Sequence, residues 1–218
     1  MYKLLKYDIF HIEKQLQQRL SYAYNWGQKQ NDEWDQYTNF IYNIPNWQAV
    51  VEAMRATLEV HPLNKRDFFN YAANRWFNFW SAMAIEQIFS ELENVTPSHN
   101  HKNRLVDFSL NGIDLDHKTS VYPKGFRQTL FYAQKHEEEL LQWLYKNQSQ
   151  QQRKHLENRL FLIVHAADGE HWKLKAEITW LKTKVENYVK HFSPSQLKQL
   201  PLEEDRTALA DIIWAVKE

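Results

Sequence analysis

The residues with the clearest chemical potential are acidic and lie on either side of an Asn-Gly pair. Asn111-Gly112 is a strong two-residue signal for a β-hairpin, and counting outwards from it places Asp107 opposite Asp116. Directly opposed side chains lie about 4.5–5.5 Å apart at Cβ, and opposed like charges destabilise a sheet. The pair therefore predicts a cation between the two carboxylates, most simply a divalent metal. Lys118, two residues beyond Asp116, adds an ammonium on the same face.

Alternation along the two predicted strands separates an apolar face from an acidic one. The apolar face comprises Val106, Phe108, Leu110, Ile113 and Leu115. The other face comprises Asp107, Asp114, Asp116 and Lys118. Asp114 is an alternative ligand, but we favour Asp116 because it opposes Asp107 and precedes Lys118 at a spacing of two. A plain surface hairpin is the competing interpretation, although a solvent-exposed face would favour mixed charges across the pair.

A third carboxylate lies upstream, in a long apolar segment that predicts a helix over about residues 65–93. Glu86 shares one stripe of this helix with apolar side chains and therefore points inwards. The stripe comprises Phe79, Ala82 and Phe89. A buried carboxylate requires a partner. Two interpretations remain open: Glu86 is a third metal ligand or orients metal-bound water, or it forms an ordinary salt bridge to a cation such as Arg75 or Lys118.

These residues carry a resemblance to a known family. Asp107 followed by Asp116-His117-Lys118 resembles the D…(D/E)xK signature of the PD-(D/E)XK nuclease superfamily. The stretch from Gln128 to Tyr132 resembles the QxxxY motif of the RecB-like branch, and Ala82 to Glu86 resembles its GxxxE motif with Ala in place of Gly. The three pieces occur in the expected order. Two features depart from the pattern: Val106 rather than Pro precedes Asp107, and the chain has no cysteine for an iron–sulfur cluster.

The resemblance implies an α/β fold with a restriction-endonuclease-like core, in which helices flank a mixed central sheet. It implies metal-dependent hydrolysis of phosphodiester bonds in nucleic acid, with DNA favoured, in defence, restriction, repair or mobile-element biology. Glu86, Asp107, Asp116 and a main-chain carbonyl near His117 would hold Mg²⁺ or Mn²⁺. Lys118 would orient the attacking water, and Gln128 and Tyr132 would support Lys118 or touch the substrate. Nearby, Lys124 and Arg127 are predicted phosphate contacts.

Composition limits the possible partners. Lys plus Arg equals Asp plus Glu at 27 each, which counts against extensive contact with a duplex and permits only a local basic patch. The absence of cysteine excludes disulfides and fits a reducing cytoplasm. We find no apolar run long enough to cross a membrane, and the charged N-terminal stretch is not that of a signal peptide. We therefore expect a cytoplasmic protein without a membrane partner.

Two other function classes remain open. The chain could be a catalytically inactive nuclease-fold module that binds nucleic acid. Alternatively, it could be a subunit that mediates protein interactions, with a protein partner or as a homo-oligomer, which the helical N-terminus and neutral charge would suit.

The remaining pattern predicts two parts, a helical N-terminal subdomain over 1–62 and the nuclease-like core over 63–218. The polar loop 94–103 holds His99 and His101, for which solvated histidines are favoured over a zinc site, and Lys102 and Arg104 as possible phosphate contacts. Downstream, the expected elements are a helix over 127–147, a polar linker over 147–155, a buried central strand over 160–164, a half-exposed strand over 172–178, a helix over 180–192 and a helical tail over 205–217.

Overall fold

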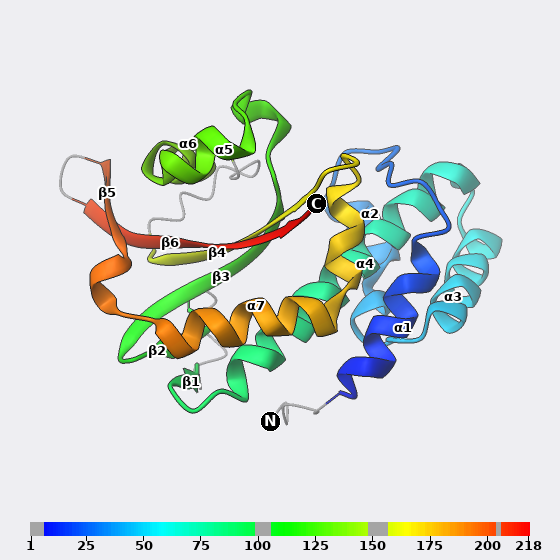
Figure 1. Ribbon diagram of the computed structural model, residues 1–218. Coiled ribbons are helices and arrows are strands. Elements are labelled where there is room, and N and C mark those ends of the chain that lie inside the picture. Colours follow the sequence, from blue (N-terminus) through cyan, green and yellow to red (C-terminus); the bar gives the residue numbers. More distant parts are fainter. Residues whose placement is uncertain (1–6, 99–105, 148–156, 204–205) are drawn as a thin grey trace. The chain divides into compact units, whose positions relative to one another are not determined.

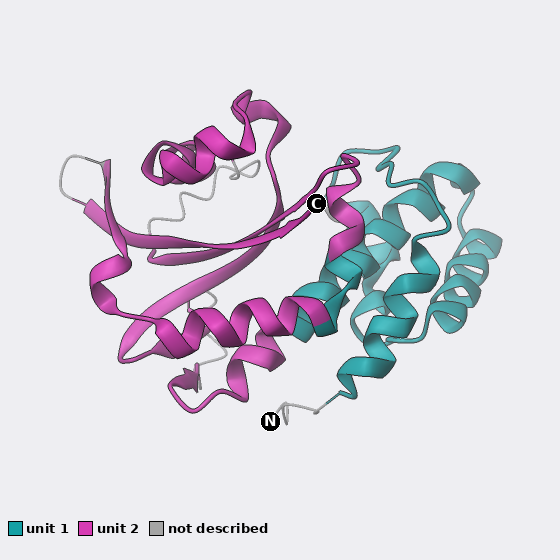
Figure 2. Cartoon of the chain, viewed as in Figure 1, with its two compact units in different colours: residues 1–85, 175–179 teal, residues 86–174, 180–218 magenta. Residues whose placement is uncertain are grey.

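The computed structural model describes residues 7–98, 106–147, 157–203 and 206–218. The chain forms two compact units, one of residues 1–85 and 175–179 and the other of residues 86–174 and 180–218 (Figure 2). The sequence placed a division at residue 62, whereas in the structure it falls later, inside a long helix. The expected loop residues His99, His101, Lys102 and Arg104, and most of the polar linker, lie outside the described residues.

The first unit is helical, as predicted. Its elements are α1 (Ile9–Arg19), α2 (Asp32–Tyr37), the 3₁₀ helix η1 (Asn39–Tyr42), α3 (Trp47–Val60) and most of α4 (Lys65–Ser90). Asn46 caps α3 by accepting from the Ala49 N–H, as its position before the apolar run predicted.

Aromatic side chains explain why most of α4 belongs to this unit. The indole N–H of Trp76 donates to the Ile44 carbonyl at 2.7 Å, and that of Trp80 donates to the Ile41 carbonyl at 2.9 Å. The rings of Trp47 and Trp76 lie 5.2 Å apart. These large, fully or nearly fully buried rings find their partners in the segments that precede α4, and residues of α4 up to Ile85 accordingly belong to the first unit.

The second unit contains a six-stranded mixed sheet in the order β1-β2-β3-β4-β6-β5 (Figure 1). The strands are β1 (Val95–Pro97), β2 (Phe108–Leu110), β3 (Ile113–Val121), β4 (Arg159–Ala166), β5 (Lys198–Glu203) and β6 (Arg206–Lys217). The first three are antiparallel neighbours, β4 and β6 continue the sheet in parallel with β3, and β5 closes it antiparallel to β6. The α/β class and the mixed sheet are confirmed.

The predicted hairpin is present in the predicted register. Leu110 pairs with Ile113, and Phe108 pairs with Leu115. Asn111 and Gly112 both have positive φ, 49° and 84°, which is the requirement of a type I′ turn and the reason that this dipeptide is favoured there.

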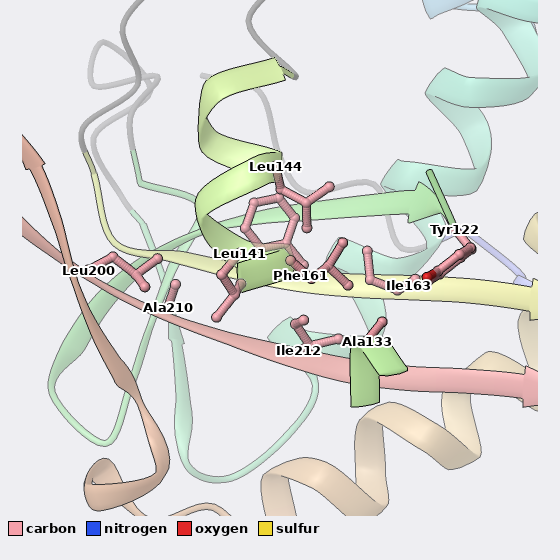
Figure 3. Packing of buried hydrophobic residues seen from close by; sticks show 10 residues of the cluster. Tyr122, Ala133, Leu141, Leu144, Phe161, Ile163, Leu200, Ala210 and Ile212 are labelled. Atoms are coloured by element: carbon pink, nitrogen blue, oxygen red, sulfur yellow. The ribbon is translucent and has the colours of Figure 1, made fainter. Parts of the chain in front are cut away.

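Helices cover both faces of the sheet within this unit. Helices α5 (Leu130–Lys135) and α6 (Glu137–Asn147) lie over one face, and α7 (Ile178–His191) runs along the other (Figure 1). Leu141 and Leu144 of α6 pack against Phe161 of β4 and Ile212 of β6 in a fully apolar layer (Figure 3). β4 is buried along nearly its whole length, which confirms the central strand predicted from its continuous apolar run.

Three predicted elements differ from the structure. The helix expected over 127–147 is broken: Thr129 caps α5 by accepting from the Tyr132 N–H, and α6 starts anew at Glu137. The strand expected over 172–178 is wrong, because His171–Ala176 is a 3₁₀ helix. The helical tail is also wrong, because that segment is strand β6. An apolar run that is buried on both faces shows no period that separates helix from strand.

Two further 3₁₀ turns, η2 (Lys124–Phe126) and η4 (Pro194–Gln196), complete the described elements. Among the described residues, no helix is long and apolar enough to span a membrane.

Candidate functional site

Three potential metal ligands converge at one end of the hairpin. Glu86 lies in the last turns of α4, Asp107 immediately precedes β2, and His117 is in β3. One carboxylate oxygen from each acid and one ring nitrogen of His117 all lie within 4.8 Å of one another. All three residues belong to the second unit.

Backbone and side-chain contacts fix His117 and Asp107 together. Asp107 Oδ2 accepts a hydrogen bond from the main-chain N–H of His117 at 2.7 Å. This bond holds Asp107 against β3, one residue before the first paired residue of β2. The imidazole packs against Phe89 of α4, with ring centroids 5.3 Å apart. Its Nε2 lies 3.1 Å from Thr119 Oγ1, while its buried Nδ1 has no hydrogen-bond partner in the described part of the chain.

The electrostatics of the cluster are those of crowded, half-buried acids. Burial, followed by the negative charges of Asp107 and Asp116, raises the pKa of Glu86 to about 8. Burial also raises the pKa of Asp107 to about 6, although the hydrogen bond from the His117 N–H opposes the rise. Burial lowers the pKa of His117 to about 3, so its imidazole is neutral at physiological pH. Two such acids beside a neutral imidazole form a site that a divalent cation would stabilise.

A second, charged cluster extends over the other side of β3. Asp116 forms an ion pair with Nε of Arg159, the first residue of β4 and its register partner. The Arg159 guanidinium also lies over the rings of Tyr145 and Phe161, each 5.7 Å away. Burial lowers the pKa of Lys118, the nearby Arg159 lowers it further, and Asp116 opposes the change. Asp116, Lys118 and Arg159 are therefore close enough to influence one another.

The structure divides the residues that the sequence grouped together. It brings Glu86 and Asp107 together as expected. Asp116 is not part of the clustered ligand atoms, because its carboxylate is turned towards Arg159. The third clustered group is the ring of His117, where the sequence predicted the main-chain carbonyl.

Gln128 and Tyr132 do not form the expected support for Lys118. α5 begins only at Leu130, so Gln128 precedes the helix and the two side chains do not share a helical face. Gln128 is exposed, and its carbonyl accepts the Tyr122 hydroxyl at 2.9 Å. The Tyr132 hydroxyl donates to Glu139 at 3.0 Å. The cap at Thr129 is the physical reason, because it starts the helix at Leu130, three residues later than the pattern assumed.

Lys124 and Arg127 lie at the opposite end of β3 from the acids. The strand stays extended from Asp116 to Val121, which at about 3.3 Å per residue separates the two ends by roughly 15 Å or more. Both cations are exposed, and Arg127 adopts a left-handed conformation with φ 56°. The prediction that they clamp a phosphate beside the acids does not fit this placement.

Two residues of the site were missed in the sequence. Arg159 immediately precedes the apolar run of the central strand. A cation at the start of a buried strand needs an acidic partner, and this was the signal that could have identified it. The His117 side chain was overlooked because strict alternation assigned it to the apolar face of the hairpin. The His117 side chain does lie on that apolar face, and the carboxylate of Glu86 lies close to it there.

Comparison with known proteins adds no relative: no family model matches the chain, and neither a curated protein nor a solved structure is significantly similar to it.

Proposed function

We propose that the chain is a metal-dependent nuclease that hydrolyses phosphodiester bonds of nucleic acid, with DNA the favoured substrate. The observation that carries the proposal is that two clusters on β3 lie close enough to shift one another's pKa values: the half-buried acids Glu86 and Asp107, and the ion pair of Asp116 and Arg159 with Lys118 beside it. Acids that share a site hold a divalent metal, and cations beside them suit the phosphate of a substrate. The D…DxK resemblance and the mixed sheet flanked by helices support the same proposal.

Each residue has a role in this proposal. Glu86 and Asp107 hold Mg²⁺ or Mn²⁺, which when bound lowers the pKa of a water ligand and neutralises charge that develops on the phosphate. Lys118 contacts a non-bridging phosphate oxygen or positions the attacking water. Its lowered pKa makes its ammonium a better proton donor than an ordinary lysine. Arg159 holds Asp116 and screens its charge from the incoming phosphate.

Cleavage assays test the proposal directly. The purified 218-residue chain is incubated with linear and circular DNA, single-stranded DNA and RNA, in Mg²⁺, Mn²⁺ or EDTA. We expect metal-dependent products from at least one substrate. Lys118→Ala should reduce the cleavage rate at least about a hundredfold while preserving the fold, since a positioned proton-transfer or electrostatic group contributes that much.

Lys190→Ala is the matched control, because it removes an exposed lysine at the end of α7. It should cleave at the wild-type rate. An unchanged rate in Lys118→Ala would overturn the role of Lys118, and no cleavage under any condition would overturn the nuclease.

A catalytically inactive nucleic-acid-binding module is the second candidate. The ion pair between Asp116 and Arg159 favours it, because it occupies a carboxylate that the resemblance assigns to the metal. Filter binding of the same nucleic acids in EDTA separates the two functions, since the inactive module would bind nucleic acid and leave it intact in every metal.

A further inference from the structure

The donor atoms of the site define the kind of metal that it would hold. Glu86 and Asp107 offer hard carboxylate oxygens, and His117 adds a ring nitrogen within the same 4.8 Å group. Donors on opposite sides of a small divalent ion are about 4.0–4.4 Å apart, given metal–donor distances of about 2.0–2.2 Å. Adjacent donors are closer still, so the three side chains, which already lie within 4.8 Å of one another, would draw together to share one ion.

The surroundings of the imidazole are those of a metal ligand. His117 is only 8% exposed, and its Nδ1 is buried without a hydrogen-bond partner among the described residues. Leaving a buried polar atom unpaired is unfavourable and calls for a partner. Nε2 lies 3.1 Å from Thr119 Oγ1, so a proton on Nε2 can be donated to the hydroxyl. That tautomer leaves the Nδ1 lone pair free, and ligating histidines commonly donate their other ring N–H in this way.

The position of Asp116 argues that it is not one of the ligands. Neighbouring residues of a strand point to opposite faces, so Asp116 and His117 lie on opposite sides of β3. His117 packs on Phe89 of α4, whereas Asp116 pairs with Arg159, whose guanidinium lies over Tyr145 of α6. Moving Asp116 to the metal would leave the buried Arg159 without its carboxylate partner.

We propose that Glu86, Asp107 and the imidazole of His117 form a two-carboxylate, one-nitrogen site that selects a first-row transition ion of the Mn²⁺ or Co²⁺ type over Mg²⁺ and Ca²⁺. Imidazole is a ligand for transition metals, whereas Mg²⁺ and Ca²⁺ take oxygen donors and gain little from nitrogen. This inference rests on the metal site of the proposed function and names the metal that this site prefers.

Binding measurements on the full chain test the selectivity. Calorimetric titrations with Mn²⁺, Co²⁺, Mg²⁺ and Ca²⁺ should show that the wild type binds Mn²⁺ at least about tenfold more tightly than Mg²⁺. His117→Phe keeps an aromatic ring against Phe89 and removes both nitrogens. It should weaken Mn²⁺ binding by at least about 10- to 100-fold, the effect of removing even a group that only supports a ligand, with a smaller effect on Mg²⁺.

Two matched variants separate ligand loss from general effects. His165→Phe removes a histidine of β4 whose buried Nδ1 likewise has no hydrogen-bond partner in the described part of the chain, and it should leave Mn²⁺ affinity unchanged. Asp116→Asn should keep the preference for Mn²⁺. Loss of that preference in Asp116→Asn, with His117→Phe unaffected, would overturn the ligand set.

Pulsed electron paramagnetic resonance of Mn²⁺-loaded wild type provides a test that needs no variant, in case His117→Phe does not fold. Coupling of the metal to ¹⁴N is expected, and its absence, or equal affinity for Mg²⁺ and Mn²⁺, would overturn the inference. The outcome is separable from that of the nuclease: nitrogen coupling without cleavage of any substrate overturns only the enzyme, and cleavage without nitrogen coupling overturns only the selectivity.

Discussion

At the scale of single residues, the site is an accumulation of negative charge that the fold holds at a cost. Glu86 is half-buried near two other carboxyl groups, and these surroundings favour its protonated form. Asp107 shows the same tendency but is partly compensated by the N–H of His117. Such acids destabilise a metal-free protein at neutral pH, and a cation removes the penalty.

This charge gives the stability of the metal-free protein a definite pH dependence. The folded pKa of Glu86, about 8, exceeds its ordinary value of 4.5, so between these values the folded state binds a proton that the unfolded state releases. Stability therefore falls as the pH rises through this window. Glu86→Gln carries no charge and should unfold with a flatter pH dependence in EDTA. At pH 8 it should be more stable than wild type by on the order of 2–4 kcal/mol, and at pH 4.5 nearly equal.

Denaturant unfolding at several pH values measures this difference. Glu93→Gln, which removes an exposed carboxyl group shortly after α4, is the control and should follow the wild-type curve. If Glu86→Gln also follows that curve, the buried acid does not carry the charge penalty.

At the scale of elements, the hairpin of β2 and β3 sets the distance between the ligands. Asp107 precedes β2 and His117 is in β3, so their contact depends on the type I′ turn at Asn111-Gly112. A β-carbon at Gly112 would meet no atom within 4 Å, so a substitution there acts through backbone conformation alone.

Gly112→Ala should therefore cost about 1–2 kcal/mol of unfolding free energy, the penalty of a left-handed conformation with a β-carbon. Gly169→Ala is a matched control, because Gly169 also has positive φ and open space but lies in the turn after β4. Both variants should lose similar stability in denaturant, while only Gly112→Ala should also weaken Mn²⁺ binding. Equal metal affinity in the two variants would show that the turn does not position the ligands.

At the scale of the whole molecule, the site belongs to one compact unit, and a bound metal should stabilise the folded chain by mass action. The gain is about 2.7 kcal/mol at a metal concentration one hundred times Kd. Asp107→Asn removes a ligand and a charge together, and its amide oxygen can still accept the His117 N–H. In EDTA its free energy of unfolding should exceed that of wild type by on the order of 1 kcal/mol or less, so it should melt at a slightly higher temperature. Millimolar Mn²⁺ should raise its melting temperature little.

Thermal melts with and without Mn²⁺ compare wild type, Asp107→Asn and the control Asp114→Asn. Asp114 is exposed on the same hairpin, so its variant should respond to metal as wild type does. A wild type that gains no stability from millimolar Mn²⁺ would exclude the proposed site.

Local pattern was sufficient for several parts of this protein. The hairpin and its register follow from Asn111-Gly112, because few other dipeptides accept positive φ at both positions. The capped helix after Asn46 and the buried strand β4 likewise follow from signals within a few residues. The approach of Glu86 to Asp107 was expected from the family resemblance, because the helix pattern alone left a salt bridge open for Glu86.

Tertiary structure decided what local pattern could not express. The tail around Ile212 is a strand because β4 and β5 supply its hydrogen-bond partners. Those partners lie elsewhere in the chain, so the pattern of residues within the segment cannot indicate them. Asp116 is paired away from the acids because β4 brings Arg159 into register with it across 43 residues of sequence. The His117 ring lies beside the two carboxylates where Phe89 of α4 packs against it, a contact between segments far apart in the chain that no local pattern records.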